Sequence, residues 1–455
     1  MMKKLASILK NKEIMGRIVF TIMILLIFRI GAQIPVPGAT IPDESALNTY
    51  LSGNNALSIM NLLGGGTLQS FSIFALGVSP YITAQIIVQL LSTDVLPALT
   101  DLKRQGQYGR KKMELATRYL TLLLGAVQAY GIIKTMENSE FVTFTTGDTA
   151  WLSYLYVVVV LLAGSMLVMW LGDQISTKGI GNGISMIIFA GIVSSLPGQM
   201  ATAFTTWVSQ GFLTGMAASA VAGVFKFLLY VLCYLLIIAF VTFVELAKRK
   251  IPVQHSGKGG GQTASMAKAS FLPIKINSAG VIPVIFASSI LTAPSVIAAF
   301  IGNGKEPEWL GIFNMTTMYK MTDNWSMPWG LIIYLVLTVV FTFFYANLQI
   351  NPEQMAENFQ KNGSYIPGIR PGIETERYVR KVLNRVTVLG AISLCIIAAI
   401  PPILTLTGVF GGNHSLALGG TGMIIVVGVA LELNSQIDGL LAGKSFDEVV
   451  ASGGQ

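Results

Sequence analysis

The histidines and cysteines of this chain are not spaced for catalysis. The sequence has no HExxH, GxSG or GxxxxGK[ST] motif, so the usual groups for metalloproteolysis, serine hydrolysis and nucleotide hydrolysis are missing. His255 and His414 are the only histidines, and they are predicted on opposite sides of a membrane. Cys233 and Cys395 each lie alone in an apolar stretch, which favours buried small residues over a disulfide or metal ligands. We expect a protein that is not an enzyme and has no catalytic residue, cofactor or metal site.

Ion-coupled transport would require ionisable side chains near the middle of the membrane. The apolar stretches contain five such residues, mostly near their predicted ends: Arg29, Lys226, Glu245, Glu432 and Asp438. Long charged side chains near helix ends usually extend to the membrane surface. A midplane ion pathway is therefore not indicated.

Isoleucines recur at helical spacing in two of the apolar stretches. Ile82 with Ile86, and Ile184 with Ile188, are i, i+4 pairs, so each pair lies on one face of a helix. Spacing alone favours core packing for such pairs.

The elements that must position these residues are membrane spans. Of the 455 residues, 53% are hydrophobic and only 11% are charged, against about 25% charged residues in soluble domains. A chain of this composition is a multi-spanning membrane protein. Windows of about 19 residues predict ten spans, at residues 18–34, 75–93, 115–134, 152–171, 183–198, 217–245, 278–300, 328–347, 386–405 and 418–437.

One uncharged segment, residues 45–93, does not fit a single spanning helix. Gly64, Gly65 and Gly66 interrupt it, and Gly77 and Pro80 interrupt it again. Broken backbone at membrane depth is tolerated only inside protein or along a water-filled cavity. The segment predicts that something passes through this protein or lodges in its middle.

The distribution of Lys and Arg predicts the topology. The N-terminus and the loops after the second, sixth and eighth spans are rich in Lys and Arg, whereas the alternate loops are not. By the positive-inside rule, both termini are cytoplasmic. A cleaved signal peptide would also suit the basic start, but Arg29 interrupts its apolar run, so an uncleaved first helix is the simpler interpretation.

Five spans before residue 200 and five after it suggest two halves, residues 1–200 and 201–455. Such halves occur where inverted repeats enclose a central path. Residues 179–183, with the sequence GIGNG, open the fifth span. They are interpreted as a tight cytoplasmic turn, because a nucleotide-binding loop would need a preceding strand.

Four separated segments, in order along nearly the whole chain, resemble the SecY family, the channel subunits of the bacterial Sec protein translocase (the SecY/translocon alpha family). They are FALGVSPYI at 74–82, WLGDQ at 170–174 continuing to GIGNGIS at 179–185, AGVIP at 279–283, and PGIRPG at 367–372. The resemblance implies an all-α polytopic membrane protein, with ten transmembrane helices in two pseudo-symmetric five-helix halves around a central hourglass pore.

The function implied by the resemblance is a protein-conducting channel. It would pass unfolded secretory polypeptides across the plasma membrane and release membrane helices sideways, driven by the SecA ATPase or by the ribosome. Six isoleucines match the pore constriction of the family: Ile82, Ile86, Ile184, Ile188, Ile285 and Ile425. A narrow apolar constriction also resists wetting by ions.

Residues from about 60 to 72 resemble the plug of the family, a short broken helix that fills the external funnel of the resting channel. The glycines would let this segment hinge. The expected plug residues are Gly64, Gly65, Gly66, Thr67, Leu68 and Phe71. Without the resemblance, a re-entrant loop packed for structural reasons is an equal alternative.

The resemblance also implies a lateral gate between the second and third spans on one side and the seventh and eighth on the other. Its candidate polar members are Gln85, Gln128, Ser288 and Ser289. Ordinary interhelical hydrogen bonds would explain the same residues.

Cytoplasmic loops at 246–277 and 351–385 match those that dock SecA or the ribosome in the family. Basic residues suit both partners, and Arg249, Lys250 and Arg370 are the predicted contacts, while topology-setting charge explains other bases. A glycine run at 255–261 replaces basic residues that are common in the family. The implied partners are the SecE and SecG subunits, SecA, the ribosome, preproteins with signal sequences, and membrane lipids.

Two other functions fit the ten spans by themselves. A secondary transporter of a small solute would need a midplane charge pair, and the sequence offers six isoleucines instead. A membrane insertase or scaffold without a through-pore would need no plug.

Overall fold

Long apolar helices make up most of this computed structural model, which describes residues 11–40, 61, 64–92, 99, 102, 105, 107–138, 143–144, 150–209, 217–255, 270–301, 308–315, 318–322, 325–407 and 420–452. Within these residues, eight helices are long and apolar enough to cross a membrane. They are α2 (Lys12–Gly31), α7 (Gln107–Asn138), α8 (Ala150–Lys178), α9 (Gly183–Phe204), α11 (Ala217–Leu246), α13 (Trp329–Gln349), α15 (Ile373–Leu406) and α16 (Gly420–Ser452). The chain is a multi-pass helical membrane protein.

Two further apolar helices occupy the other two predicted spans. They are α5 (Ser79–Leu91) and α12 (Ile282–Ile301). With 13 residues, α5 is shorter than the roughly 20 residues that cross a bilayer. Ten helices therefore overlap the ten predicted segments, while the number that cross the membrane stays a prediction.

Two helices extend well past their predicted spans: α16 ends at Ser452 and not near residue 437, and α15 begins at Ile373 and not near residue 386. A short amphipathic helix, α14 (Pro352–Lys361), precedes it and begins with Asn351 as its N-cap. The predicted loop 351–385 is thus largely helical. Hydropathy detects apolar helix only, so it stops where charged residues begin although the helix continues.

Three small antiparallel sheets were missed by the all-α prediction. The largest, in the order β4-β3-β7, joins β3 (Lys248–His255) to β4 (Ser270–Lys275) and β7 (Ser364–Tyr365). Two 2-stranded sheets pair β1 (Ala39–Thr40) with β2 (Thr143–Phe144), and β5 (Tyr319–Thr322) with β6 (Trp325–Met327). The remaining elements are a short π-helix, η1 (Thr205–Ser209), and a short 3₁₀-helix, η2 (Glu308–Phe313). The β1–β2 and β3–β7 pairings join segments about 100 residues apart, so local patterns do not predict them.

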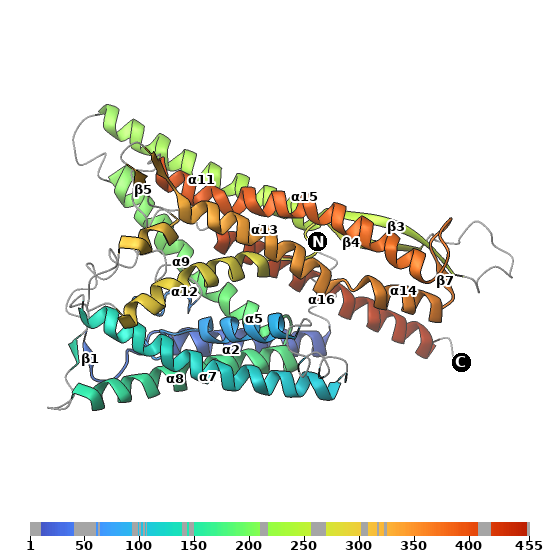
Figure 1. The fold of residues 1–455 in the computed structure, drawn as a ribbon, viewed down its shortest axis with the longest axis horizontal. Helices are drawn as coiled ribbons and strands as arrows, with labels where there is room; N and C mark the ends of the chain where they lie inside the picture. Colours follow the sequence, from blue (N-terminus) through green and yellow to red (C-terminus); the bar gives the residue numbers. More distant parts are fainter. Residues whose placement is uncertain are drawn as a thin grey trace.

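The helices form two groups (Figure 1). Helices α2, α5, α7 and α8 lie on one side and α11, α13 and α15 on the other, and the β4-β3-β7 sheet lies at one end beside α14. Three other helices connect the groups: α12 contacts α5 and α7 as well as α13, and α9, which packs on α2 and α8, contacts α16, which packs on α11 and α15. A large apolar cluster occupies the centre, and a smaller one lies between the sheet and the start of α15.

Glycine allows α8 to touch the broken segment that precedes α5. A Cβ atom added to Gly164 would lie 2.0 Å from the carbonyl oxygen of Ile73. No side chain fits at that distance, so this position requires glycine.

We predict that Gly164→Ala destabilises the protein by about 1 to 3 kcal/mol, because the new methyl group must push the 73–77 backbone away. Gly198→Ala in α9 is the control, since its Cβ would meet nothing within 4 Å. That substitution is expected to be neutral or slightly stabilising. Thermal unfolding of the purified proteins in detergent measures both, and equal melting temperatures would contradict the close contact.

Candidate functional site

The six isoleucines of the predicted constriction lie in one apolar cluster at the centre of the molecule. Ile82, Ile86, Ile188 and Ile425 are buried, with 6%, 3%, 3% and 2% of their surface exposed. Ile184 and Ile285 are partly buried and pack against the same cluster. Four helices, α5, α9, α12 and α16, supply these side chains. Tertiary structure thus brings together residues more than 300 positions apart, and their role as a ring stays a prediction.

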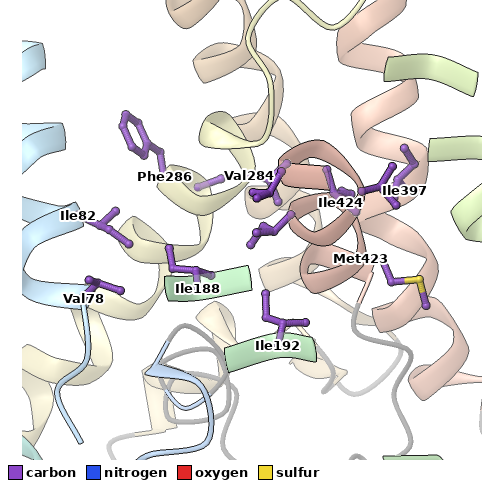
Figure 2. Packing of buried hydrophobic residues seen from close by; sticks show 14 of the residues in the cluster. Val78, Ile82, Ile188, Ile192, Val284, Phe286, Ile397, Met423 and Ile424 are labelled. Carbon is purple, nitrogen blue, oxygen red and sulfur yellow. The ribbon is translucent and has the colours of Figure 1, made fainter. Parts of the chain in front are cut away.

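The cluster extends beyond the six isoleucines. Figure 2 shows side chains of the cluster, among them Ile82 of α5, Ile188 of α9 and Ile424 of α16, which lies beside Ile397. Val284 and Phe286 come from α12, and Met423 and Ile397 come from α16 and α15. The side chains labelled in Figure 2 are all apolar, so the part of the centre that they form carries no fixed charge.

The GIGNG turn positions α9 within this cluster. Gly181 has a φ of +93°, and a Cβ on Gly183 would lie 1.8 Å from the carbonyl oxygen of Gly172 in α8. Asn182 caps α9 by accepting hydrogen bonds from the backbone of Ile184 and Ser185. This geometry agrees with the prediction of a tight turn before a helix.

Two polar side chains that sequence reasoning missed hold the GIGNG turn in place. The backbone N–H of Ile180 donates to Thr21 Oγ1 of α2 at 3.1 Å, and the N–H of Gly181 donates to Gln436 Oε1 of α16 at 2.8 Å. The turn therefore joins helices from both ends of the chain. No local signal marks Thr21 or Gln436 as its partners.

The predicted plug segment is described at residue 61 and from residue 64 onward. Leu68 and Phe71 are almost fully buried in a second cluster, with side chains of α7 and α8. Gly65 lies against α9, where its added Cβ would stand 2.6 Å from Gly191 Cα. The segment therefore packs against two different parts of the protein. Leu68 and Phe71 contact α7 and α8, whereas Gly65 contacts α9, the helix that carries Ile188.

Among the predicted gate residues, Ser288 and Gln128 differ in their hydrogen bonding. Ser288 donates to the carbonyl oxygen of Ile285 within its own helix, at 2.8 Å. The Oε1 atom of Gln128 is buried and accepts no hydrogen bond from the described residues. Gln85 is half-buried on α5, and Ser289 follows Ser288 on α12. Helix α12 contacts both α5 and α7, so these residues lie on packed helices.

A polar contact between α5 and α13 was not predicted. The hydroxyl group of Tyr345 donates to Gln89 Oε1 at 3.1 Å. Phe286 of α12 meets the Tyr345 ring edge to face, with ring centroids 5.4 Å apart. The contact joins residues 256 positions apart, which explains why the sequence offered no sign of it.

The three predicted contact bases are exposed at the end of the molecule that carries the β4-β3-β7 sheet. Arg249 and Lys250 lie on β3, and Arg370 lies in the PGIRPG turn that leads to α15. Gly368 and Gly372 have φ values of +82° and +102°, which a glycine adopts without strain. Residues 256–261 of the glycine run lie outside the described residues. The β4-β3-β7 sheet therefore joins the two predicted docking loops, 246–277 and 351–385, to each other.

Within the described residues, no group of three or more His, Cys, Asp or Glu side chains could hold a metal ion.

Comparisons with known proteins identify close relatives of the chain. The sequence pattern of the SecY family matches residues 72–434. The protein translocase subunit SecY of Lactococcus lactis is 41% identical over 447 residues, which cover 98% of this chain and 97% of that protein.

Solved channels share the fold. A SecY structure, reported with the finding that its plug domain stabilises the closed state of the translocation channel and maintains a membrane seal, matches with a TM-score of 0.63 and 19% identity over 94% of this chain and 92% of that chain. Sec61 from a canine ribosome-channel complex matches with a TM-score of 0.60 and 18% identity over the same shares.

Proposed function

This chain belongs to the SecY family, and we propose that it is the protein-conducting channel of a membrane translocase, not an enzyme. Its relatives at about 40% identity over nearly their whole length are protein translocase subunits. The observation in the structure that supports the proposal most directly is the central apolar cluster, which gathers all six isoleucines of the predicted constriction.

An apolar constriction suits a channel whose cargo has no fixed sequence. Aliphatic side chains make no directional bonds, so they can close around any segment of an unfolded chain without retaining it. The same narrow apolar passage disfavours water and ions when it is empty. We propose that the six isoleucines form this constriction, between two five-helix halves made of residues 1–200 and 201–455.

The glycine turn at 64–66 is proposed as part of a plug. Its contact with Gly191 sets it beside the central cluster, while Leu68 and Phe71 anchor the following residues elsewhere. A solved relative is described as having a plug domain that maintains a membrane seal. The described residues thus fit a segment with a fixed base and a separate tip.

The lateral gate is proposed between α5 and α7 on one side and α12 and α13 on the other. In the structure α12 packs on both α5 and α7, and the Tyr345 to Gln89 hydrogen bond connects α13 to α5; both contacts would close this seam. Signal sequences and membrane helices would leave through this seam, with Gln85, Gln128, Ser288 and Ser289 as its nearby polar residues.

Partners and location follow from the family. Solved relatives were determined in complexes with ribosomes, and exposed bases on the cytoplasmic loops suit ribosomal RNA. We propose the ribosome and the SecA ATPase as driving partners, SecE and SecG as accompanying subunits, and the bacterial plasma membrane as the location, with both termini in the cytoplasm.

A solute transporter and an insertase or scaffold without a through-pore remain the competing functions. A transporter would bind its solute through midplane charges, whereas the described centre is apolar. An insertase without a pore would not place a secretory chain next to both α5 and α12. The first experiment below separates these functions.

We predict that a secretory chain stalled during export forms cross-links with cysteines introduced in place of Ile82 and Ile285, because both side chains lie in the central cluster. Cysteine in place of Tyr119 is the control, since that α7 side chain is 71% exposed on the outside of the molecule. Adducts at Tyr119 without adducts at Ile82 or Ile285 would reject the pore assignment.

Arg370→Glu is expected to reduce export at least tenfold, because it reverses an exposed charge on the proposed docking loop. Lys178→Glu is the matched control, an exposed base at the end of α8 that lies outside both proposed docking loops. Export is measured with purified protein in vesicles, and insertion is checked by proteolysis. Normal export by the inserted Arg370→Glu protein would remove this residue from the partner site.

Tyr345→Phe is expected to favour gate opening by about 1 kcal/mol, or roughly fivefold, because it removes one hydrogen bond between α5 and α13. The measurement is the membrane insertion of test helices of graded hydrophobicity, which should succeed at lower hydrophobicity. Tyr334→Phe in the same helix is the control, because its buried hydroxyl has no hydrogen-bond partner within the described residues. Identical insertion thresholds for the two variants would contradict the gate role.

A further inference from the structure

Arg29 is a charged residue in the last turn of a membrane-spanning helix. It is half-buried on α2, and its guanidinium donates a hydrogen bond from Nη1 to the carbonyl oxygen of Gly65 at 2.9 Å. No carboxylate among the described residues forms an ion pair with it. A charge within a membrane span is costly and usually has a functional partner. Here the partner is a backbone carbonyl in the proposed plug.

The backbone at Gly65 has a conformation that only glycine adopts easily. Gly65 and Gly66 have φ values of +78° and +83°. The turn brings Gly65 so close to Gly191 that a Cβ on Gly191 would lie 2.4 Å from Gly65 Cα. Gly191 lies between Ile188 and Ile192 of α9, both buried in the central cluster. The Gly65 peptide is therefore held between Arg29 and the helix that lines the cluster.

The residues after this turn are attached far more firmly. The N–H of Ile73 donates to the carbonyl oxygen of Ile34, and the N–H of Val36 donates to that of Phe71, both at 3.0 Å. Ser70 Oγ also donates to the carbonyl oxygen of Ala32 at 3.1 Å. By contrast, the side-chain bond from Arg29 is what ties residues 64–66 to α2. One side chain can thus control the tip without loosening the base.

We propose that Arg29 is the positioning residue that holds the plug tip, residues 64–66, against α9 in the closed channel. This inference rests on the proposed channel function. A hydrogen bond from a charged donor is stronger than a neutral one, yet water can replace both partners when the tip moves out. The bond is therefore suited to a contact that must break and form again.

The test is the ion conductance of vesicles that contain the purified protein and no cargo. Arg29→Met keeps the length of the side chain but removes the donor, and it is expected to raise the leak about tenfold. Arg29→Lys retains a charged donor and should stay close to the unmodified protein. Arg17→Met, on the same helix, is the control, because Arg17 pairs with Glu13 one turn away at 3.3 Å.

A second substitution tests whether Arg29 acts through the tip. Gly191→Ala should raise the leak by itself, since its methyl group collides with Gly65. Adding Arg29→Met to it should then change the leak less than twofold, because the tip is already displaced. If the leak of the double variant instead rises by the product of the two single increases, Arg29 acts elsewhere and the proposal is overturned.

Export of a secretory chain by the same vesicles separates the two claims. If the unmodified protein does not export, the channel assignment fails, whatever the leak. If Arg29→Met exports but leaks no more than Arg17→Met, the role of Arg29 fails while the channel assignment stands. If Arg29→Met does not insert, Arg29→Gln replaces it, and an unchanged leak in that variant relative to Arg29→Lys and Arg17→Met also overturns the proposal.

Discussion

Every backbone polar group at membrane depth must find its partner within the protein, and the break before α5 is where this constraint is hardest to meet. The broken segment meets it through other parts of the chain. Ile73 bonds to the backbone after α2, and the carbonyl oxygen of Gly77 accepts a bond from Ser165 Oγ of α8 at 3.1 Å. Because these bonds tie the segment to two helices, it also sets where α5 begins and where Ile82 lies.

Close backbone contacts at glycines make this packing possible. Gly164 admits the carbonyl of Ile73, Gly183 admits that of Gly172, and Gly191 admits Gly65. In each case a methyl group would lie within 2.4 Å of a backbone atom. At Gly164 and Gly191, helices α8 and α9 can therefore approach the non-helical segment before α5 closely.

The centre of the molecule is packed with apolar side chains. Apolar side chains can separate and close again without leaving a donor or acceptor unpaired, whereas a buried polar interface could not do so without a free-energy cost. Polar contacts also join distant helices: Tyr345, which belongs to the central cluster, donates to Gln89, and the backbone of Gly181 donates to Gln436. An apolar centre of this kind suits a passage that opens for varied cargo.

Composition and hydropathy by themselves determined that the chain is a membrane protein, the approximate positions of its helices, and the break at Gly64 to Gly66, because these features depend on local residue type. The motifs indicated the family, and with it the six isoleucines. Hydropathy placed the start of the ninth span too late, since the charged start of α15 is helical but not apolar. Only the tertiary structure decided that Arg29 meets Gly65 and that Tyr345 meets Gln89. Those pairs join residues 36 and 256 positions apart, and no local pattern of spacing records which distant surfaces pack together.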